Sequence, residues 1–175
     1  KFFSNKLLIL IMKIAIIGTG NLGLSIAQGL IINNTITSLY LTKRNIESIE
    51  EWSENKYVTV TKNNIEAVKK SDILIFSVQP NQFEEILNEI NTHLTNKHII
   101  ISTITGFHIN RIESVIGNKI PIIRSMPNTA ISVGKSMTCL CSNEIGEKRI
   151  DIASAIFNGL GNSIIINEND MQAAT

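Results

Sequence analysis

Three glycines with the spacing Gly-x-Gly-x-x-Gly, at Gly18, Gly20 and Gly23, are the residues best suited to a chemical role. They follow an apolar run at 13–17 and open a segment at 21–32 that has apolar residues along one helical face. Gly18 would permit a sharp turn out of a strand, Gly20 would let a pyrophosphate approach bare backbone, and Gly23 would let the helix lie close to the sheet. The helix would direct its free N–H groups and positive dipole end at the phosphates. The pattern predicts a dinucleotide site, and the alternative is a tight structural turn.

The residues after the second expected strand bear on which dinucleotide binds. In an NAD-binding unit, an Asp or Glu about 20 residues past the glycines accepts a hydrogen bond from the ribose 2′-hydroxyl. At that place this chain has Lys43 and Arg44. Two cations would pair with a 2′-phosphate, which a carboxylate would repel. The sequence therefore predicts NADP(H) in preference to NAD(H), and the alternative is two solvated basic residues at a helix start.

Strand-like and helix-like segments alternate along the chain, which is typical of a parallel sheet covered by helices on both faces. We expect one α/β domain with a Rossmann-like, doubly wound and mainly parallel sheet, to which the last strands could be antiparallel additions. The expected strands are at 13–17, 38–42, 57–61, 72–77, 98–102, 120–125, 134–140 and 162–166. The expected helices are at 21–32, 46–54, 64–70, 81–93, 108–116 and 144–160.

Two loops of this expected fold lie beside the glycine turn. The residues at 77–80 and 102–106 follow the fourth and fifth strands, and ligands bind at the carboxyl edge of such sheets. We expect these loops to lie on the nicotinamide side of a cofactor. The alternative is that Pro80 is a helix first-turn proline and Gly106 a turn glycine.

Composition excludes several classes of function. The 175 residues suit a single domain, and a net charge of +1 gives no electrostatic case for nucleic acid or an anionic membrane. Cys139 and Cys141 form a C-x-C pair, in which a disulfide within one strand would be strained. The histidines at 93, 98 and 108 show no metal-site spacing. We therefore expect no metal and two reduced thiols, as in a reducing compartment.

The two ends of the chain differ from its middle. The apolar run at 7–12 is too short to span a bilayer, which takes about 20 residues. We interpret 1–11 as an upstream extension or a misplaced start, 12–168 as the dinucleotide-binding domain, and 169–175 as the start of a helix leading onward.

A more specific pattern stands at the sixth expected strand, where the chain has Arg124-Ser-Met-Pro-Asn-Thr-Ala130. This segment resembles the Arg-x-Met-Pro-Asn-Thr-Pro pattern of pyrroline-5-carboxylate reductases, which complete proline synthesis. Residues 77–80 are similar to that family's Ala-Val-Lys-Pro loop, 102–106 to its Ser-x-x-x-Gly loop, and 170–175 to its Met-Asp-Ala-Val-Thr helix start. The resemblance covers about 12–175.

The resemblance implies hydride transfer from NADPH to the C=N carbon of a small-molecule substrate, 1-pyrroline-5-carboxylate, giving L-proline in the cytoplasm. It implies pyrophosphate contacts at the glycine turn, contacts to the adenosine ribose after the second strand, and nicotinamide-side contacts from later loops. The implied cofactor-binding residues are Ile17, Gly18, Thr19, Gly20, Asn21, Leu22, Gly23, Lys43, Arg44, Asn45, Asn64, Ser77, Val78, Gln79, Pro80, Thr103, Ile104, Thr105 and Asn128.

In that family a helical domain follows the part that this chain resembles, and it carries the substrate-carboxylate contacts and the homo-oligomer interface. We therefore name no catalytic residue and expect the chain alone to hold cofactor and turn over poorly or not at all. Three residues depart from the family's pattern: Gln79 replaces a lysine, Ala130 a proline and Ser136 a glycine. Two other hypotheses stand beside the reductase. One is another NADP-linked dehydrogenase, acting on a β-hydroxy acid or a reduced deazaflavin, and the other is a non-enzymatic nucleotide-sensing homologue.

Overall fold

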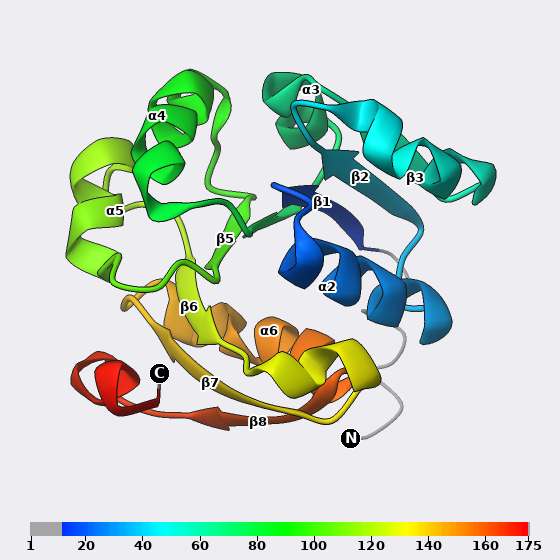
Figure 1. Ribbon diagram of the computed structural model, residues 1–175. Helices are drawn as coiled ribbons and strands as arrows, with labels where there is room; N and C mark the ends of the chain where they lie inside the picture. The colour runs from blue at the N-terminus through cyan, green and yellow to red at the C-terminus, as the bar shows by residue number, and fades with distance from the viewer. Residues whose placement is uncertain (1–11, 175) are drawn as a thin grey trace.

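One sheet organises the described part of the chain, residues 12–174, in this computed structural model; the expectation about residues 1–11 lies outside the described residues. The strand order is β3-β2-β1-β4-β5-β6-β7-β8 (Figure 1). The strands are β1 (Lys13–Ile17), β2 (Ser38–Thr42), β3 (Val58–Thr61), β4 (Ile73–Phe76), β5 (Ile99–Ser102), β6 (Ile122–Met126), β7 (Ser136–Ser142) and β8 (Gly161–Ile165).

Strand directions confirm the predicted doubly wound, mainly parallel sheet. Neighbouring strands from β3 through β1 to β6 pair in parallel, β7 pairs antiparallel to β6, and β8 pairs parallel to β7. The strand order reverses at β1, which lies between β2 and β4. That reversal opens a crevice at the carboxyl edge of such sheets, where their ligands bind.

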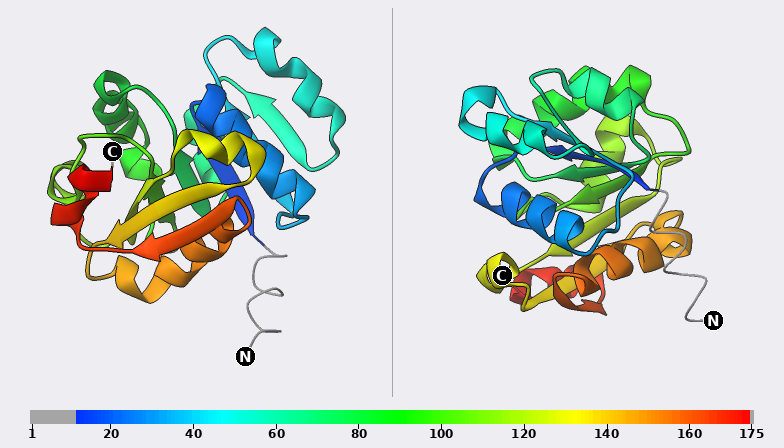
Figure 2. Two further views of the ribbon diagram at one scale, coloured as in Figure 1. Left: turned by 60° about the horizontal axis from the view of Figure 1, so that its bottom comes forward. Right: turned by 90° about the vertical axis from the view of Figure 1, so that its right-hand side faces the viewer.

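Helices cover both faces of the sheet (Figure 2). The α-helices are α2 (Asn21–Ile32), α3 (Asn64–Lys69), α4 (Pro80–Ile90), α5 (Ile109–Ile116) and α6 (Ile150–Asn158). Short 3-10 segments connect them: η1 (Ile46–Glu54), η2 (Asn91–His93), η3 (Thr129–Val133), η4 (Gly146–Arg149) and η5 (Glu168–Ala174).

Alternating residues of the strands feed two separate cores. On β1, Ile14 and Ile16 pack with α2 and α6, whereas Ala15 and Ile17 pack with α3, α4 and α5. All four side chains are fully buried. A strand that buries both faces needs apolar residues at every position, which explains the continuous apolar runs in the sequence.

Two expected helices form differently. Residues 46–54 form 3-10 turns that are interrupted at Ile49, rather than an α-helix. Their apolar residues, Ile46, Ile49 and Trp52, recur every third position, which matches the three residues per turn of a 3-10 helix. The expected helix 144–160 is divided into η4 and α6, and the end of the chain at 168–174 is also 3-10. No helix within residues 12–174 is long and apolar enough to cross a membrane.

The two cysteines of β7 are free thiols, as the sequence predicts; Cys139 is half-buried and Cys141 is buried. Both lie in the core on the α5 side of the sheet. Burial, reinforced by the negative charge of Glu168, raises the pKa of Cys141 from 9.0 to about 11, against a smaller lowering by Arg124. Because this pKa is raised, Cys141 stays a neutral thiol throughout the neutral range.

We predict that iodoacetamide at pH 8 alkylates Cys139 well before Cys141 in the folded chain, because the thiolate is the reactive form and Cys141 lacks it. Both cysteines lie in the tryptic peptide 136–148, so fragmentation of that peptide in the mass spectrometer over time measures the two sites separately. In denaturant the two should react at similar rates. Equal rates in the folded chain would contradict the burial and the raised pKa of Cys141.

Candidate functional site

The glycine turn is fastened to the end of β2. The backbone N–H groups of Gly18 and Thr19 donate to the carbonyl oxygen of Thr42 at 3.2 and 3.1 Å. The buried hydroxyl of Thr19 donates to the same oxygen at 3.1 Å. Thr19 thus has a structural role at this turn, and it brings the glycines next to the residues that follow β2.

The other side of the turn is joined to β4, and β4 to β5. The Ser77 N–H donates to the carbonyl oxygen of Ile17 at 2.9 Å. The N–H and hydroxyl of Thr103 both donate to the carbonyl oxygen of Phe76, at 3.0 and 2.9 Å. The carboxyl ends of β2, β1, β4 and β5 therefore form one continuous edge, and the glycine turn, 43–45, 77–80 and 103–105 all lie along it.

Two of the three glycines are required by close packing. Gly18 has φ +90°, and a Cβ there would overlap Val78 Cγ1 and lie 2.8 Å from the Ser77 carbonyl oxygen. A Cβ on Gly23 would lie 2.6 Å from the Gly18 carbonyl oxygen and 3.2 Å from Ile16 Cγ2. These contacts agree with the predicted sharp turn and close approach of helix and sheet.

Gly20 is different, because a Cβ built on it meets no protein atom within 4 Å. Packing therefore does not explain a glycine here, whereas an approaching ligand would. Gly20 is also the N-cap of α2, with no side-chain cap and no acidic residue in the first turn. Asn21 and Leu22 begin this helix, so a phosphate beside Gly20 would meet main-chain N–H groups and a favourable dipole. The residues present therefore fit a dinucleotide pyrophosphate.

The residues predicted to contact the adenosine ribose follow the end of β2, next to the glycine turn. Lys43 is half-buried, and Arg44 and Asn45 are exposed. Asn45 caps η1, with its Oδ1 accepting from the Glu47 N–H at 3.2 Å. Asn64 begins α3, and its Nδ2 donates to Glu89 Oε2 of α4 at 2.9 Å. Asn64 is thus engaged by a protein partner, and its contact with a cofactor stays a prediction.

The loops on the predicted nicotinamide side divide into buried and exposed residues. Thr103 and Ile104 are buried in the loop that follows β5, and Val78 packs against Gly18. Gln79 and Thr105 are exposed at the same edge, with Gln79 as the N-cap and Pro80 as the first residue of α4. Pro80 is therefore a helix first-turn proline, which is the alternative given for it in the sequence analysis.

Asn128 stands in the turn after β6, with its Oδ1 accepting from the Ala130 N–H at 3.1 Å. Ser136, which departs from the family's glycine, is buried and holds this turn: its Oγ accepts from the Asn128 N–H at 3.3 Å. It also shares a 3.0 Å hydrogen bond with the Thr138 hydroxyl. Ser136 is thus accommodated in β7 and fixes the main chain at Asn128.

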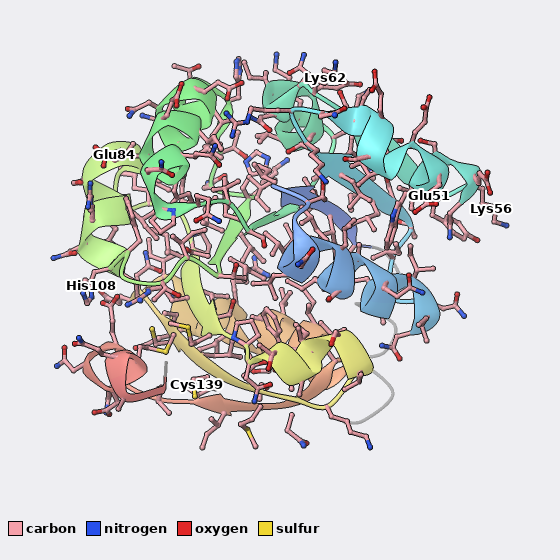
Figure 3. All side chains as sticks on the ribbon, viewed as in Figure 1. Glu51, Lys56, Lys62, Glu84, His108 and Cys139 are labelled. Carbon is pink, nitrogen blue, oxygen red and sulfur yellow. The ribbon has the colours of Figure 1, made fainter. Side chains whose placement is uncertain are left out.

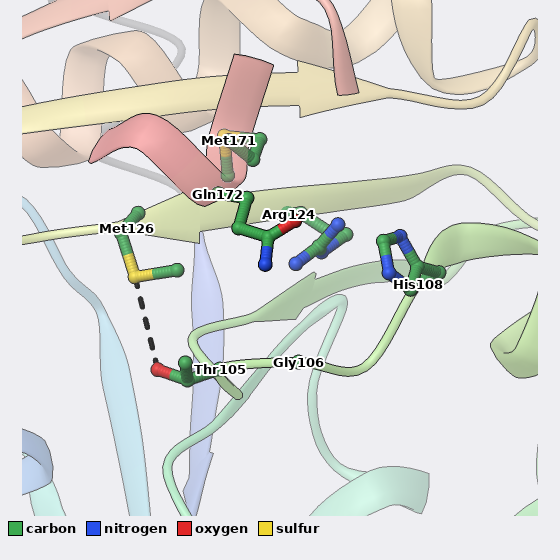
Figure 4. A pocket seen from close by; sticks show the side chains of 7 residues that line it. All are labelled: Thr105, Gly106, His108, Arg124, Met126, Met171 and Gln172. Carbon is green, nitrogen blue, oxygen red and sulfur yellow. Dashed lines mark hydrogen bonds between the residues drawn. The ribbon is translucent and has the colours of Figure 1, made fainter. Parts of the chain in front are cut away.

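A cavity of about 370 Å³, which the sequence did not predict, lies beside this edge (Figure 4). Arg124 lines this cavity. It is buried, and its Nη1 donates to Glu168 Oε1 at 2.7 Å. The same carboxylate oxygen accepts from the Ile109 N–H at 2.8 Å. The signal in the sequence was an arginine that follows the apolar pair Ile122 and Ile123 inside a predicted strand. The lining residues are Thr105, Gly106, His108, Arg124, Met126, Met171 and Gln172.

Within residues 12–174, no group of three or more His, Cys, Asp or Glu side chains is placed so that it could hold a metal ion.

Comparisons with known proteins agree with this geometry. Pyrroline-5-carboxylate reductase 1 of Dictyostelium discoideum is 38% identical over 93% of this chain, and reductase 2 of that organism is 36% identical over 93%. These matches span 32% and 60% of the two relatives, so the chain covers between a third and three fifths of their length.

Solved structures give the same result. A pyrroline-5-carboxylate reductase from Coxiella burnetii matches 91% of this chain with a TM-score of 0.85 at 28% identity. The Plasmodium falciparum pyrroline carboxylate reductase, solved with NADP bound, matches 94% with a TM-score of 0.82 at 28% identity. The matched regions span 60% and 61% of those two solved chains. The resemblance expected from the Met-Pro-Asn-Thr segment is confirmed.

A protein-family model matches the part of the chain that holds the glycine turn and the neighbouring strand ends. The model described as NADP oxidoreductase, coenzyme F420-dependent, matches residues 13–106, which is more than half of the chain. The matched range includes β1, the glycine turn and the strands on either side of it. This chain belongs to the NADP oxidoreductase, coenzyme F420-dependent family.

Proposed function

We propose that this chain is the cofactor-binding part of a reductase that converts 1-pyrroline-5-carboxylate to L-proline with NADPH. The observation that carries the proposal is the open space beside Gly20, at the N-terminus of a helix without acid or side-chain cap. The similarity to pyrroline-5-carboxylate reductases over 93% of the chain supports the choice of substrate.

In this proposal the bound nicotinamide would supply a hydride for the C=N carbon of the substrate, which reacts as the imine already protonated on nitrogen, and NADP⁺ would be left. The chain's own residues position it: the turn at 18–23 holds the pyrophosphate, and Lys43 and Arg44 hold the 2′-phosphate. The loops at 77–80 and 103–105 and Asn128 flank the nicotinamide side. Positioning of this kind makes the transfer effectively unimolecular. No residue of this chain is proposed as an acid or base.

The family match favours a second candidate, because the model's description includes coenzyme F420. In that case electrons would pass between NADP and a reduced deazaflavin at the same edge. The two candidates share the cofactor crevice and differ in the partner of the nicotinamide.

Substrate assays separate these candidates. We expect the chain to bind NADPH and to oxidise it slowly with 1-pyrroline-5-carboxylate, monitored by NADPH absorbance with proline detected by mass spectrometry. Reduction of NADP⁺ by reduced F420 is the parallel arm, and heat-denatured chain is the control for the spontaneous reaction. Turnover with F420 alone would replace the proposed substrate, and absence of nucleotide binding would reject the proposal.

Gly20→Val should weaken the binding of both NADPH and NADH by at least about tenfold, because its branched side chain fills the space for the pyrophosphate. The backbone at Gly20 is extended, with φ −79° and ψ −165°, a conformation that valine adopts, so the melting temperature should change little. Gly20→Ala, with only a Cβ, should give a smaller loss. Unchanged affinity in the valine variant would remove the turn from the site.

Replacing Lys43 and Arg44 together with alanine should weaken NADPH binding by roughly tenfold to a hundredfold, since two charge-assisted contacts to a phosphate are lost. NADH lacks the 2′-phosphate, and its affinity should change by less than about threefold. Titration of both nucleotides by fluorescence measures the two losses. Equal losses would reject the assignment of these residues to the 2′-phosphate.

A further inference from the structure

Lys62 is a third positively charged residue near Lys43 and Arg44. The parallel register of β2 and β3 places Thr42 opposite Thr61, and the Lys43 N–H donates to the Thr61 carbonyl oxygen at 3.3 Å. The pairing therefore continues past both strand ends, and Lys62 is the next residue opposite Lys43. Neighbouring strands lie about 4.8 Å apart, so the two lysines emerge side by side at the carboxyl edge.

The turn that carries Lys62 is ordered by its own hydrogen bonds. The Asn63 N–H donates to Thr61 Oγ1 at 3.1 Å, and the Glu66 N–H donates to Asn63 Oδ1 at 3.0 Å. The Thr61 hydroxyl donates to Glu66 Oε2 at 3.0 Å. These bonds fix the main chain on both sides of Lys62. Its position at the edge is therefore set by the fold and not by the lysine side chain itself.

The charges at this edge are unbalanced. Within residues 12–174, no ion pair involves Lys43, Arg44 or Lys62. Glu66, the acid of the same turn, is bonded to the Thr61 hydroxyl. Lys62 lies at the end of the molecule where β3 leads into α3 (Figure 3). Three like charges, none of which forms an ion pair within residues 12–174, repel one another, and a dianionic phosphate between the strand ends would relieve that repulsion.

We propose that Lys62 is a specificity-determining residue that shares the 2′-phosphate of NADPH with Lys43 and Arg44. This inference rests on the cofactor-binding function proposed above. The phosphate offers three acceptor oxygens, and the tips of β2 and β3 present donors to it from two directions. A lysine suits this position because its flexible stem delivers a compact charge with three donors.

Two small nucleotides isolate the 2′-phosphate. Isothermal titration of the wild-type chain with 2′,5′-ADP and with 5′-AMP compares ligands that differ only in that group. Lys62→Ala should weaken 2′,5′-ADP binding by roughly fivefold to tenfold and leave 5′-AMP within about twofold, because one charge-assisted contact is lost. Lys62→Arg should retain most of the affinity for 2′,5′-ADP.

Lys56→Ala is the matched control, because Lys56 is an exposed lysine just before the other end of β3 and carries the same charge. It should leave both affinities unchanged. At 1 M salt, where the Debye length is about 3 Å, the effect of Lys62→Ala should shrink.

The outcomes separate the inference from the function on which it rests. If wild type binds 2′,5′-ADP more tightly than 5′-AMP and Lys62→Ala keeps that ratio, Lys62 has no part in specificity and the proposed function stands. Equal losses for Lys62→Ala and Lys56→Ala would show a general charge effect and also overturn the inference. If wild type binds neither nucleotide nor NADPH, the proposed function itself fails.

Discussion

The common direction of the strands from β3 to β6 is the constraint on which the rest of this structure depends. Each helical crossover returns the chain so that successive strands end at one edge of the sheet. The order reverses at β1, where the connections leave in opposite directions, and ligands of such sheets bind at that reversal. The main-chain hydrogen bonds to the carbonyl oxygens of Thr42, Ile17 and Phe76 then fix this edge. Residues more than 80 positions apart in sequence meet there as a result.

The three glycines of the turn are needed for two different reasons. At Gly18 and Gly23 the absence of a Cβ is needed by the protein itself, since backbone atoms occupy the space. At Gly20 the protein leaves the space open. A structural turn would need only Gly18 and Gly23. The open space at Gly20 therefore favours the proposed ligand site over a purely structural turn, a distinction that the spacing of the three glycines alone does not make.

A buried charged side chain lies in β6, away from the glycine turn. Arg124 is buried in β6, and its partner Glu168 belongs to η5, 44 residues later. Arg124 is buried and Glu168 is partly buried, so loss of the carboxylate would leave a buried positive charge without its ion-pair partner, which is destabilising. Glu168 also accepts from the first turn of α5, so a single carboxylate joins β6, α5 and the last segment of the described chain. The pair thereby holds the wall of the cavity in place.

Local patterns were sufficient for the central strands, because a strand buried on both faces must be mainly apolar, as at Ile73–Phe76 and at residues 99–101. They were less reliable for 46–54, where the predicted helix is instead two short 3-10 pieces that meet at the buried, non-helical Ile49. For the candidate site, the sequence identified the turn and the residues after each strand, since these follow from chain order. It did not assign Thr19, Thr103 and Ser136 to structural hydrogen bonds.

The amino-acid sequence by itself determined the alternation of elements, the sheet class, the glycine turn and the likeness to pyrroline-5-carboxylate reductases, because each is encoded by neighbouring residues. Only the tertiary structure decided that Gly20 faces open space, that Arg124 meets Glu168, and that Lys62 emerges beside Lys43. Those relations depend on the register and packing of elements distant in sequence, where no local pattern specifies which residues become neighbours.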